Sequence, residues 1–195
     1  IVAPQPVESE VIIETRGLSR IYPGVTALDN VNYRVYRNKV NVLIGENGAG
    51  KSTMMKMLAG VETPSSGQII LDGEAVTLNS THQAEKFGIS IIFQELNLFP
   101  NMNVMDNIFM ANEFFQKGRI NEKYQYALAK SLLERLELDV DPYTQLGELG
   151  IGHQQLVEIA RALSKDTRVL IMDEPTSALS QSEVKVLFKV IEQLK

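Results

Sequence analysis

Glycines surround a lysine and a serine in the stretch Gly45–Ser52, which reads Gly-Glu-Asn-Gly-Ala-Gly-Lys-Ser. This spacing satisfies the pattern G-x-x-x-x-G-K-[ST], in which a glycine-rich backbone curls so that its N–H groups point at phosphate oxygens. Lys51 would supply a cation to the β- and γ-phosphates, and Ser52 would offer its hydroxyl to Mg²⁺. We therefore predict a phosphate-binding loop made of Gly45, Glu46, Asn47, Gly48, Ala49, Gly50, Lys51, Ser52 and Thr53.

The residues on either side of this loop favour that prediction over a glycine-rich turn without a ligand. Val40–Ile44 is nearly continuous in apolar residues, as in a buried parallel strand. Lys51–Ala59 has a helical pattern closed by Gly60, and its positive N-terminal end would face the anion. A strand, a loop and a helix in that order are the context that the motif requires.

An acidic pair, Asp173-Glu174, follows a second apolar segment that is predicted to be a strand, Val169–Met172. Ligands of open α/β sheets gather at the carboxyl ends of the strands. Asp173 could hold Mg²⁺ through water, and Glu174 could orient and polarise an attacking water. Alone, the pair would be better explained as solvated acids at a strand end. Beside a phosphate loop, the metal and catalytic roles become the better explanation.

The remaining pattern predicts an α/β protein with an antiparallel beginning and a helical insertion between Phe93 and Arg168. We expect strands at Val11–Arg16, from Ala27 with alternating apolar residues, in a hairpin around Asp72-Gly73, at Ile89–Phe93 and at Arg168–Met172. We expect helices from Ser80 to Gly88, over Val104–Leu138 with a break near Gly118, at His153–Leu163 and at Ser182–Lys195. The apolar face of the last helix would be Val184, Leu187, Phe188 and Ile191.

Composition narrows the class of protein. The 195 residues carry 19 basic and 24 acidic side chains, and this net charge of −5 gives no support for nucleic-acid binding. The absence of cysteine excludes disulfides and a thiolate zinc site. No apolar run reaches the roughly 18 residues that a membrane span needs. Residues 1–10 look like a loose leader rather than a signal peptide, and the helical pattern still running at Lys195 suggests a longer protein.

Taken in order, these motifs resemble the nucleotide-binding domain of ABC transporters over residues 11–195. The resemblance implies ATP and Mg²⁺ as ligands and a P-loop NTPase fold of the ABC type, with an antiparallel β subdomain and a helical subdomain at about residues 100–165. It implies that Tyr22, in SRIYPGVTALDNV, stacks on adenine. Gln94, in IIFQELNLFP, would contact Mg²⁺ and the attacking water, as Ser52 and Asp173 would contact the metal.

Two further segments match the family's contacts with a second nucleotide-binding domain. Leu149, Gly150, Ile151, Gly152 and His153 stand where the family's signature usually reads Leu-Ser-Gly-Gly-Gln, so a serine hydroxyl and a glutamine are missing. The helix dipole and backbone N–H groups of this signature would still face the γ-phosphate held by the opposite domain. Ser177–Ser180 matches the segment that crosses to that domain. The relaxed signature suggests a composite site that binds ATP and hydrolyses it poorly.

The closest resemblance within the family is to the first of two tandem domains in ATPases of bacterial ribose- and galactose-type importers, with polyol importers as relatives. It implies transmembrane permease subunits, an indirect periplasmic sugar-binding protein, and a peripheral location on the cytoplasmic face of the inner membrane. Leu96, Leu98, Phe99 and Pro100 would line the groove for a permease helix. The family's switch histidine follows the catalytic glutamate, whereas His82 and His153 precede it, so we expect that strand beyond Lys195.

Two other functions compete with sugar import. A soluble ABC ATPase acting on nucleic acid or ribosomes is disfavoured by the absence of cysteine, by the acidic net charge and by the lack of a basic linker. A nucleotide-binding regulator that does not hydrolyse ATP is disfavoured by the presence of Glu174 and Gln94. We therefore expect an ATPase that drives sugar or sugar-alcohol import, with Glu174, Gln94 and Lys51 as its catalytic residues.

Overall fold

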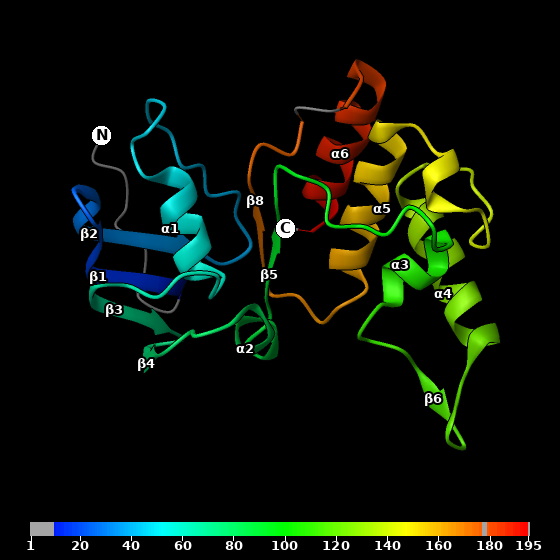
Figure 1. The fold of residues 1–195 in the computed structure, drawn as a ribbon, viewed down its shortest axis with the longest axis horizontal. Helices are drawn as coiled ribbons and strands as arrows, with labels where there is room; N and C mark the ends of the chain where they lie inside the picture. The colour runs from blue at the N-terminus through cyan, green and yellow to red at the C-terminus, as the bar shows by residue number, and fades with distance from the viewer. Residues whose placement is uncertain (1–9, 177–178, 195) are drawn as a thin grey trace. The chain divides into compact units, whose positions relative to one another are not determined.

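The structure, a computed structural model, describes residues 10–176 and 179–194. The described residues divide into two compact units, one made of residues 10–89 with Leu194 and the other spanning Ser90–Gln193. Each unit is described by itself below, and Figure 1 labels the elements of both.

The first unit contains a four-stranded antiparallel sheet with the strand order β2-β1-β3-β4. Its strands are β1 (Val11–Tyr22), β2 (Val25–Tyr36), β3 (Ser66–Leu71) and β4 (Glu74–Val76). Thr15 in the central strand pairs with Tyr33 on one side and Ile69 on the other. The predicted hairpin at Asp72-Gly73 is confirmed, because both residues adopt the positive φ angles, 53° and 85°, that a two-residue turn requires.

Two short helices complete this unit, α1 (Lys51–Leu58) and α2 (Thr81–Lys86). α1 buries Met54, Met57 and Leu58, so these side chains serve packing. α2 lies within the predicted range and is capped by Ser80, whose hydroxyl accepts a hydrogen bond from the Gln83 N–H. The capping interaction fixes where the helix starts.

The predicted buried strand before the phosphate loop is absent. No strand is formed over residues 40–46, all of which are described, and the side chains of Val42 and Ile44 are 67% and 87% exposed. A strand needs a ladder partner, and the sheet of this unit pairs only β1 to β4. The Asn41 side chain instead bonds both backbone groups of Tyr36 at 3.0 Å, in the manner of a short strand partner.

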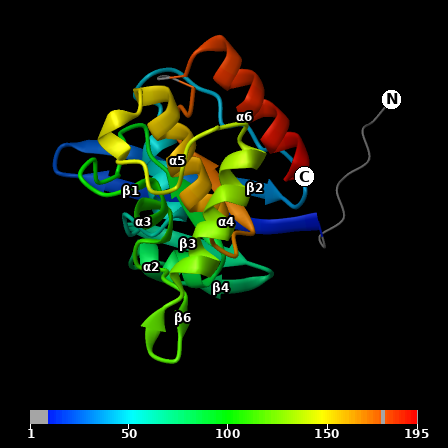
Figure 2. The same ribbon diagram turned by 90° about the vertical axis from the view of Figure 1, so that its right-hand side faces the viewer.

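The second unit pairs β5 (Ile89–Ile92), whose first residue belongs to the other unit, with β8 (Val169–Met172) in a two-stranded sheet. Its helices are α3 (Val104–Phe109), α4 (Glu122–Arg135), α5 (Ile151–Leu163) and α6 (Gln181–Gln193), with the short 3₁₀ turn Leu146–Glu148 before α5. A core cluster that includes Phe109, Leu133, Ile159 and Leu187 joins these helices. Figure 2 shows α3, α4 and α5 gathered into one bundle.

Two details of this unit differ from the prediction. The break near Gly118 is a hairpin of β6 (Phe115–Gln116) and β7 (Arg119–Ile120), which projects from the helices in Figures 1 and 2. Strands of two residues are too short to show an alternating pattern. On α6 the buried side chains are Leu187 and Val190, whereas Phe188 is 58% exposed. The predicted apolar face of α6 is therefore wrong at Phe188.

Candidate nucleotide-binding and catalytic residues

The phosphate-loop candidates form an exposed loop that runs into α1. Gly50 caps the helix with a left-handed backbone (φ 85°), and its carbonyl accepts the first helical hydrogen bond, from Met54 N–H at 2.9 Å. Gly48 is also left-handed, with φ 83°. These two conformations favour glycine, and the first N–H groups of α1 have no partner within the helix and no side-chain cap from Gly50. The N-terminus of α1 is thus open to an anion.

The Lys51 side chain folds back onto this loop. Its ammonium group donates hydrogen bonds to the carbonyl oxygens of Gly45 and Glu46, both at 2.8 Å. The loop also closes on itself through a bond from Ala49 N–H to the Glu46 carbonyl at 3.1 Å. The lysine therefore has its charge on the concave side of the backbone, where a phosphate would meet it.

Tyr22 ends β1 in the same unit and is half-buried. The Arg20 guanidinium lies 4.8 Å from the centroid of its ring, and its hydroxyl donates to the Glu62 carboxylate, which also pairs with Arg20 at 3.2 Å. Both the guanidinium and the hydroxyl bond hold the ring in one orientation. One face of Tyr22 is already occupied by a cation, so only the other could stack on a base.

Gln94 and the acidic pair come together at one edge of the second unit. The backbone N–H of Asp173 donates to the Ile92 carbonyl at 3.0 Å, which joins the ends of β5 and β8. Gln94 follows Ile92 closely, and Glu174 follows Asp173. Gln94 and Glu174 are exposed, and Glu174 has a left-handed backbone with φ 50°. A non-glycine residue in this conformation is strained, and such strain is often found at active sites.

The donor set for Mg²⁺ is chemically suitable but incomplete within the protein. Ser52 of the first unit offers a hydroxyl oxygen, and Gln94 and Asp173 of the second unit offer an amide and a carboxylate oxygen. Each is a type of ligand that this hard cation accepts. Among the described residues, no group of three or more His, Asp or Glu side chains could hold a metal ion. Mg²⁺ commonly relies on substrate phosphates and water for its other ligands, and this donor set fits such a site.

The signature candidates form the start of α5. Gly150 is the N-cap in an extended conformation (φ −62°, ψ 155°) and makes no side-chain cap. A Cβ atom on Gly150 would meet nothing within 4 Å, so a serine would fit there. Ile151 and His153 are exposed, and the first turn of α5 contains no acidic residue. The positive end of this helix is thus uncompensated within its own turn.

Glu183 links the start of α5 with the start of α6. Its carboxylate accepts a hydrogen bond from the Ser180 N–H at 2.7 Å and lies 3.8 Å from Nε2 of His153. Hydrogen bonds from Ser180, with a smaller contribution from the charge of His153, hold the pKa of Glu183 below its usual value. Of the predicted crossing segment, Ser177 and Ala178 lie outside the described residues.

Three residues that hold the loop between β5 and α3, which contains Gln94, were not predicted from the sequence. Asn107 on α3 is fully buried and bonds both backbone groups of Phe99, at 2.7 Å and 3.0 Å. Glu158 and Arg161 on α5 contact the backbone of Asn97, at 3.4 Å and 2.9 Å. A polar residue inside an otherwise apolar helical face was the available signal at Glu158.

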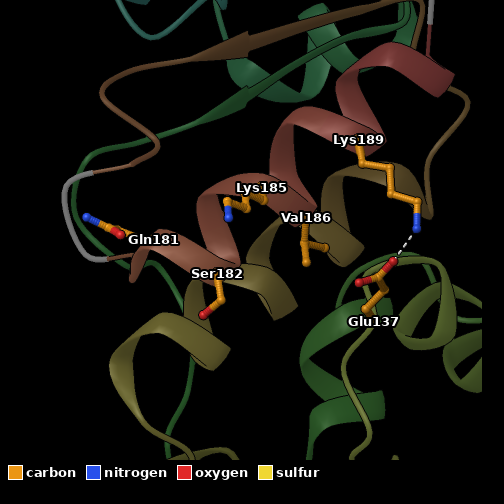
Figure 3. Close-up of a pocket in the computed structure, with 6 residues that line it drawn as sticks. All are labelled: Glu137, Gln181, Ser182, Lys185, Val186 and Lys189. Carbon is orange, nitrogen blue, oxygen red and sulfur yellow. Dashed lines mark hydrogen bonds and ion pairs between the residues drawn. The ribbon is translucent and has the colours of Figure 1, made fainter.

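A pocket of about 610 Å³ lies along α6 and begins at Gln181, directly after the predicted crossing segment. Figure 3 shows its lining, with Ser182, Lys185 and Val186 on α6 and the ion pair between Lys189 and Glu137 along one side. It contains none of the predicted site residues. Among the described residues, no helix has the length and apolar character needed to cross a membrane.

Curated relatives resemble almost all of this chain. A xylose import ATP-binding protein of Thermoanaerobacter pseudethanolicus is 49% identical over 96% of the chain, and an L-arabinose transport ATP-binding protein of Geobacillus stearothermophilus is 47% identical over 96%. A ribose import ATP-binding protein of Rubrobacter xylanophilus is 45% identical over 94%. The chain spans only 37% of the length of each of these relatives.

Solved structures show the same fold. The ADP conformation of an ATP-binding cassette from an ABC transporter matches 94% of this chain and 76% of its own, with a TM-score of 0.78 and 25% identity. A component of a Clostridium perfringens ABC transporter complex matches 95% of this chain and 75% of its own, with a TM-score of 0.76 and 28% identity. The predicted α/β class, of the ABC ATPase type, is therefore confirmed.

The family model described as "ABC transporter" matches residues 28–177, which include the phosphate loop, Gln94, the signature and the acidic pair. This match covers most of the chain and agrees with the relatives and with the solved cassettes. The chain belongs to the ABC transporter family.

Proposed function

We propose that this chain is the first nucleotide-binding domain of an ATP-hydrolysing subunit that powers a bacterial importer of a sugar or sugar alcohol. The observation that carries the proposal is the phosphate loop, whose left-handed glycines and central Lys51 leave the N-terminus of α1 open to an anion. The relatives named above are xylose, L-arabinose and ribose import or transport proteins that bind ATP. These names support a pentose as the proposed cargo, and the resemblance in sequence extends the proposal to a hexose or a related polyol.

In this proposal the loop amides and Lys51 bind the β- and γ-phosphates, and the other face of Tyr22 stacks on adenine. Ser52, Gln94 and Asp173 would hold Mg²⁺, which neutralises charge on the phosphates when it is bound. Glu174 accepts a hydrogen bond from a water and aims its oxygen at the γ-phosphorus. The new P–O bond forms as the bond between the γ-phosphorus and the bridging β-phosphate oxygen breaks, and a proton of the water passes to the Glu174 carboxylate, which yields ADP and phosphate.

The proposed partners follow from the same site. The signature Leu149–His153 presents backbone N–H groups at the start of α5 to ATP held by a second ABC domain, in the same polypeptide or in a second copy. Gly150 lacks the usual hydroxyl, so this composite site would bind ATP and hydrolyse it slowly. Permease subunits would dock beside Leu96–Pro100, which places the protein at the cytoplasmic face of the inner membrane, with a periplasmic sugar-binding protein as an indirect partner.

The test uses the full-length protein with its permease in proteoliposomes. Glu174→Gln keeps the size of the side chain but removes the acceptor charge, so ATP binding should persist while turnover falls about 10²- to 10⁴-fold. Glu134→Gln, an exposed change on α4, is the matched control. Uptake of labelled pentoses, hexoses and polyols then identifies the cargo. Unchanged turnover in Glu174→Gln would remove Glu174 from the catalytic role, and ATP hydrolysis without uptake of any of these cargoes would contradict sugar import.

A further inference from the structure

The loop between β5 and α3 contains Gln94 but no regular secondary structure of its own. Its far end is fastened by Asn107, whose side-chain amide bonds the N–H and the carbonyl of Phe99. Between Gln94 and Phe99 hydrogen bonds hold the loop at Asn97, and Leu98 packs against the core. Hydrogen bonds thus attach the loop to α3 at Phe99 and to α5 at Asn97, and beyond Phe99 the carbonyls of Pro100 and Met102 accept bonds from the N–H groups of Gly147 and Leu146 at 2.9 Å.

The attachment to α5 consists of two side chains on successive turns. A carboxylate oxygen of Glu158 accepts a hydrogen bond from the N–H of Asn97 at 3.4 Å, and the guanidinium of Arg161 donates to the carbonyl of Asn97 at 2.9 Å. Both contacts are to backbone atoms, so they fix the position of the main chain and do not depend on which side chain stands at position 97. We call Glu158 and Arg161 the Asn97 bracket.

Glu158 is costly to bury and is not explained by packing. The residue is only 6% exposed, and its Oε2 atom has no hydrogen-bond partner among the described residues. Burial raises the pKa of Glu158 above its usual value, although the Asn97 N–H and Arg161 oppose this. An apolar or small residue at this place on α5 would avoid the cost. The one bond that Glu158 accepts goes to the Gln94 loop.

The bracket shares a helix with the signature. Glu158 follows Ile151 by seven residues, about two turns of an α-helix, so the two positions lie on the same side of α5. The helix between them packs its buried residues, among them Val157 and Ile159, into the core. A rigid, well-packed helix moves as one body, so a displacement at Asn97 would shift the signature, and the reverse.

We propose that Glu158 and Arg161 are positioning residues that fasten the Gln94 loop to the signature helix. Through this attachment, permease binding at the loop alters the contact of the signature with ATP, and ATP contact at the signature alters permease binding at the loop. This inference rests on the proposed function, because it assumes that Gln94 and the signature serve ATP hydrolysis. The bracket acts through the backbone of Asn97 and touches neither nucleotide nor cargo.

The test compares Glu158→Ala and Arg161→Ala with the conservative changes Glu158→Gln and Arg161→Lys in the full-length protein with its permease. Hydrogen exchange at residues 94–99 should become faster in the alanine variants and should return toward the wild-type rate in the conservative ones, which can still bond Asn97. Cargo transported per ATP hydrolysed should fall about 2- to 30-fold in the alanine variants. Apparent affinity for ATP should stay near the wild-type value, since the phosphate loop is untouched.

Glu134→Ala and Arg135→Ala are matched controls, because they remove the same two side-chain types from exposed positions on α4. A third readout is independent of hydrolysis: permease should alter hydrogen exchange at residues 149–153 in the wild type but not in the alanine variants. Faster exchange at residues 94–99 with an unchanged transport ratio would reduce the bracket to a structural contact and overturn the proposal. If the wild-type protein has no ATPase activity, the proposed function is overturned instead. The effect of permease on hydrogen exchange at residues 149–153 would then still test the role of Glu158 and Arg161.

Discussion

The carboxylate of Glu183, on the first turn of α6, lies directly against the bare backbone of Gly152, on the first turn of α5. A Cβ atom built on Gly152 would stand 2.4 Å and 2.5 Å from the two carboxylate oxygens. The same carboxylate accepts the Ser180 N–H at 2.7 Å. One acidic side chain thus sits at the starts of two helices, where both helix dipoles favour a negative charge.

This contact predicts that the effect of Gly152→Ala depends on Glu183. Alanine at a helical position normally stabilises by up to about 1 kcal/mol relative to glycine. In the wild type this gain should be lost, because the new methyl group must displace a carboxylate that is held by Ser180. In a Glu183→Ala background the gain should return. Chemical unfolding of the four proteins in a double-mutant cycle measures the coupling, and additive effects would contradict the contact.

Glu183 also predicts a pH dependence of stability. Hydrogen bonds from Ser180, and then the charge of His153, lower its pKa in the folded protein, so the folded state binds its proton less readily than the unfolded state. Its contribution is therefore present above the ordinary pKa and is lost as pH falls through the lowered one. Unfolding measured between pH 7 and pH 3 should show Glu183→Gln less stable than the wild type at pH 7, with a difference that shrinks in acid. Glu134→Gln, which is exposed, should show no such trend.

The two left-handed glycines of the phosphate loop should differ in their tolerance of alanine. At Gly50 a Cβ atom would lie 2.5 Å from the Ala27 carbonyl oxygen and 2.7 Å from Cδ2 of Leu28, whereas at Gly48 it would meet nothing within 4 Å. Gly48→Ala should cost only backbone strain, about 1–2 kcal/mol. Gly50→Ala should cost more, since the loop must also move away from β2. Thermal unfolding without nucleotide compares them, and equal losses of stability would argue against this packing.

Local signals explain which parts of the fold were predictable. The helix beginning at Ser80, the Asp72-Gly73 turn and the helix beginning at Lys51 depend on neighbours in sequence, and all three form. The strand predicted at Val40–Ile44 does not form, because an apolar run becomes a strand only when a distant partner supplies its hydrogen bonds. The exposure of Phe188 and the burial of Glu158 likewise depend on which helices pack together. The spacing of residues along the sequence does not show which helices pack together.

The candidate site also has features that local sequence predicts and features that depend on tertiary contacts. Motif spacing predicted a phosphate loop from neighbouring residues alone, whereas the contact of Tyr22 with Glu62 joins segments far apart in sequence. The contact of Glu183 with Gly152 and the Asn97 bracket are also tertiary. The chemistry of the side chain led to the prediction of a catalytic role for Glu174, but nothing in the sequence indicated that its backbone would be left-handed.

That backbone conformation leads to the last prediction, which separates stability from activity at Glu174. A φ of 50° strains any residue with a Cβ atom and costs nothing comparable at glycine. Glu174→Gly should therefore be more stable than Glu174→Ala by up to about 1 kcal/mol, although both remove the carboxylate and both should lose most ATP turnover. Urea unfolding and phosphate release measure the two effects. Equal stability of the two variants would show that the backbone relaxes without strain, and turnover retained by either would exclude Glu174 as the residue that aims the water.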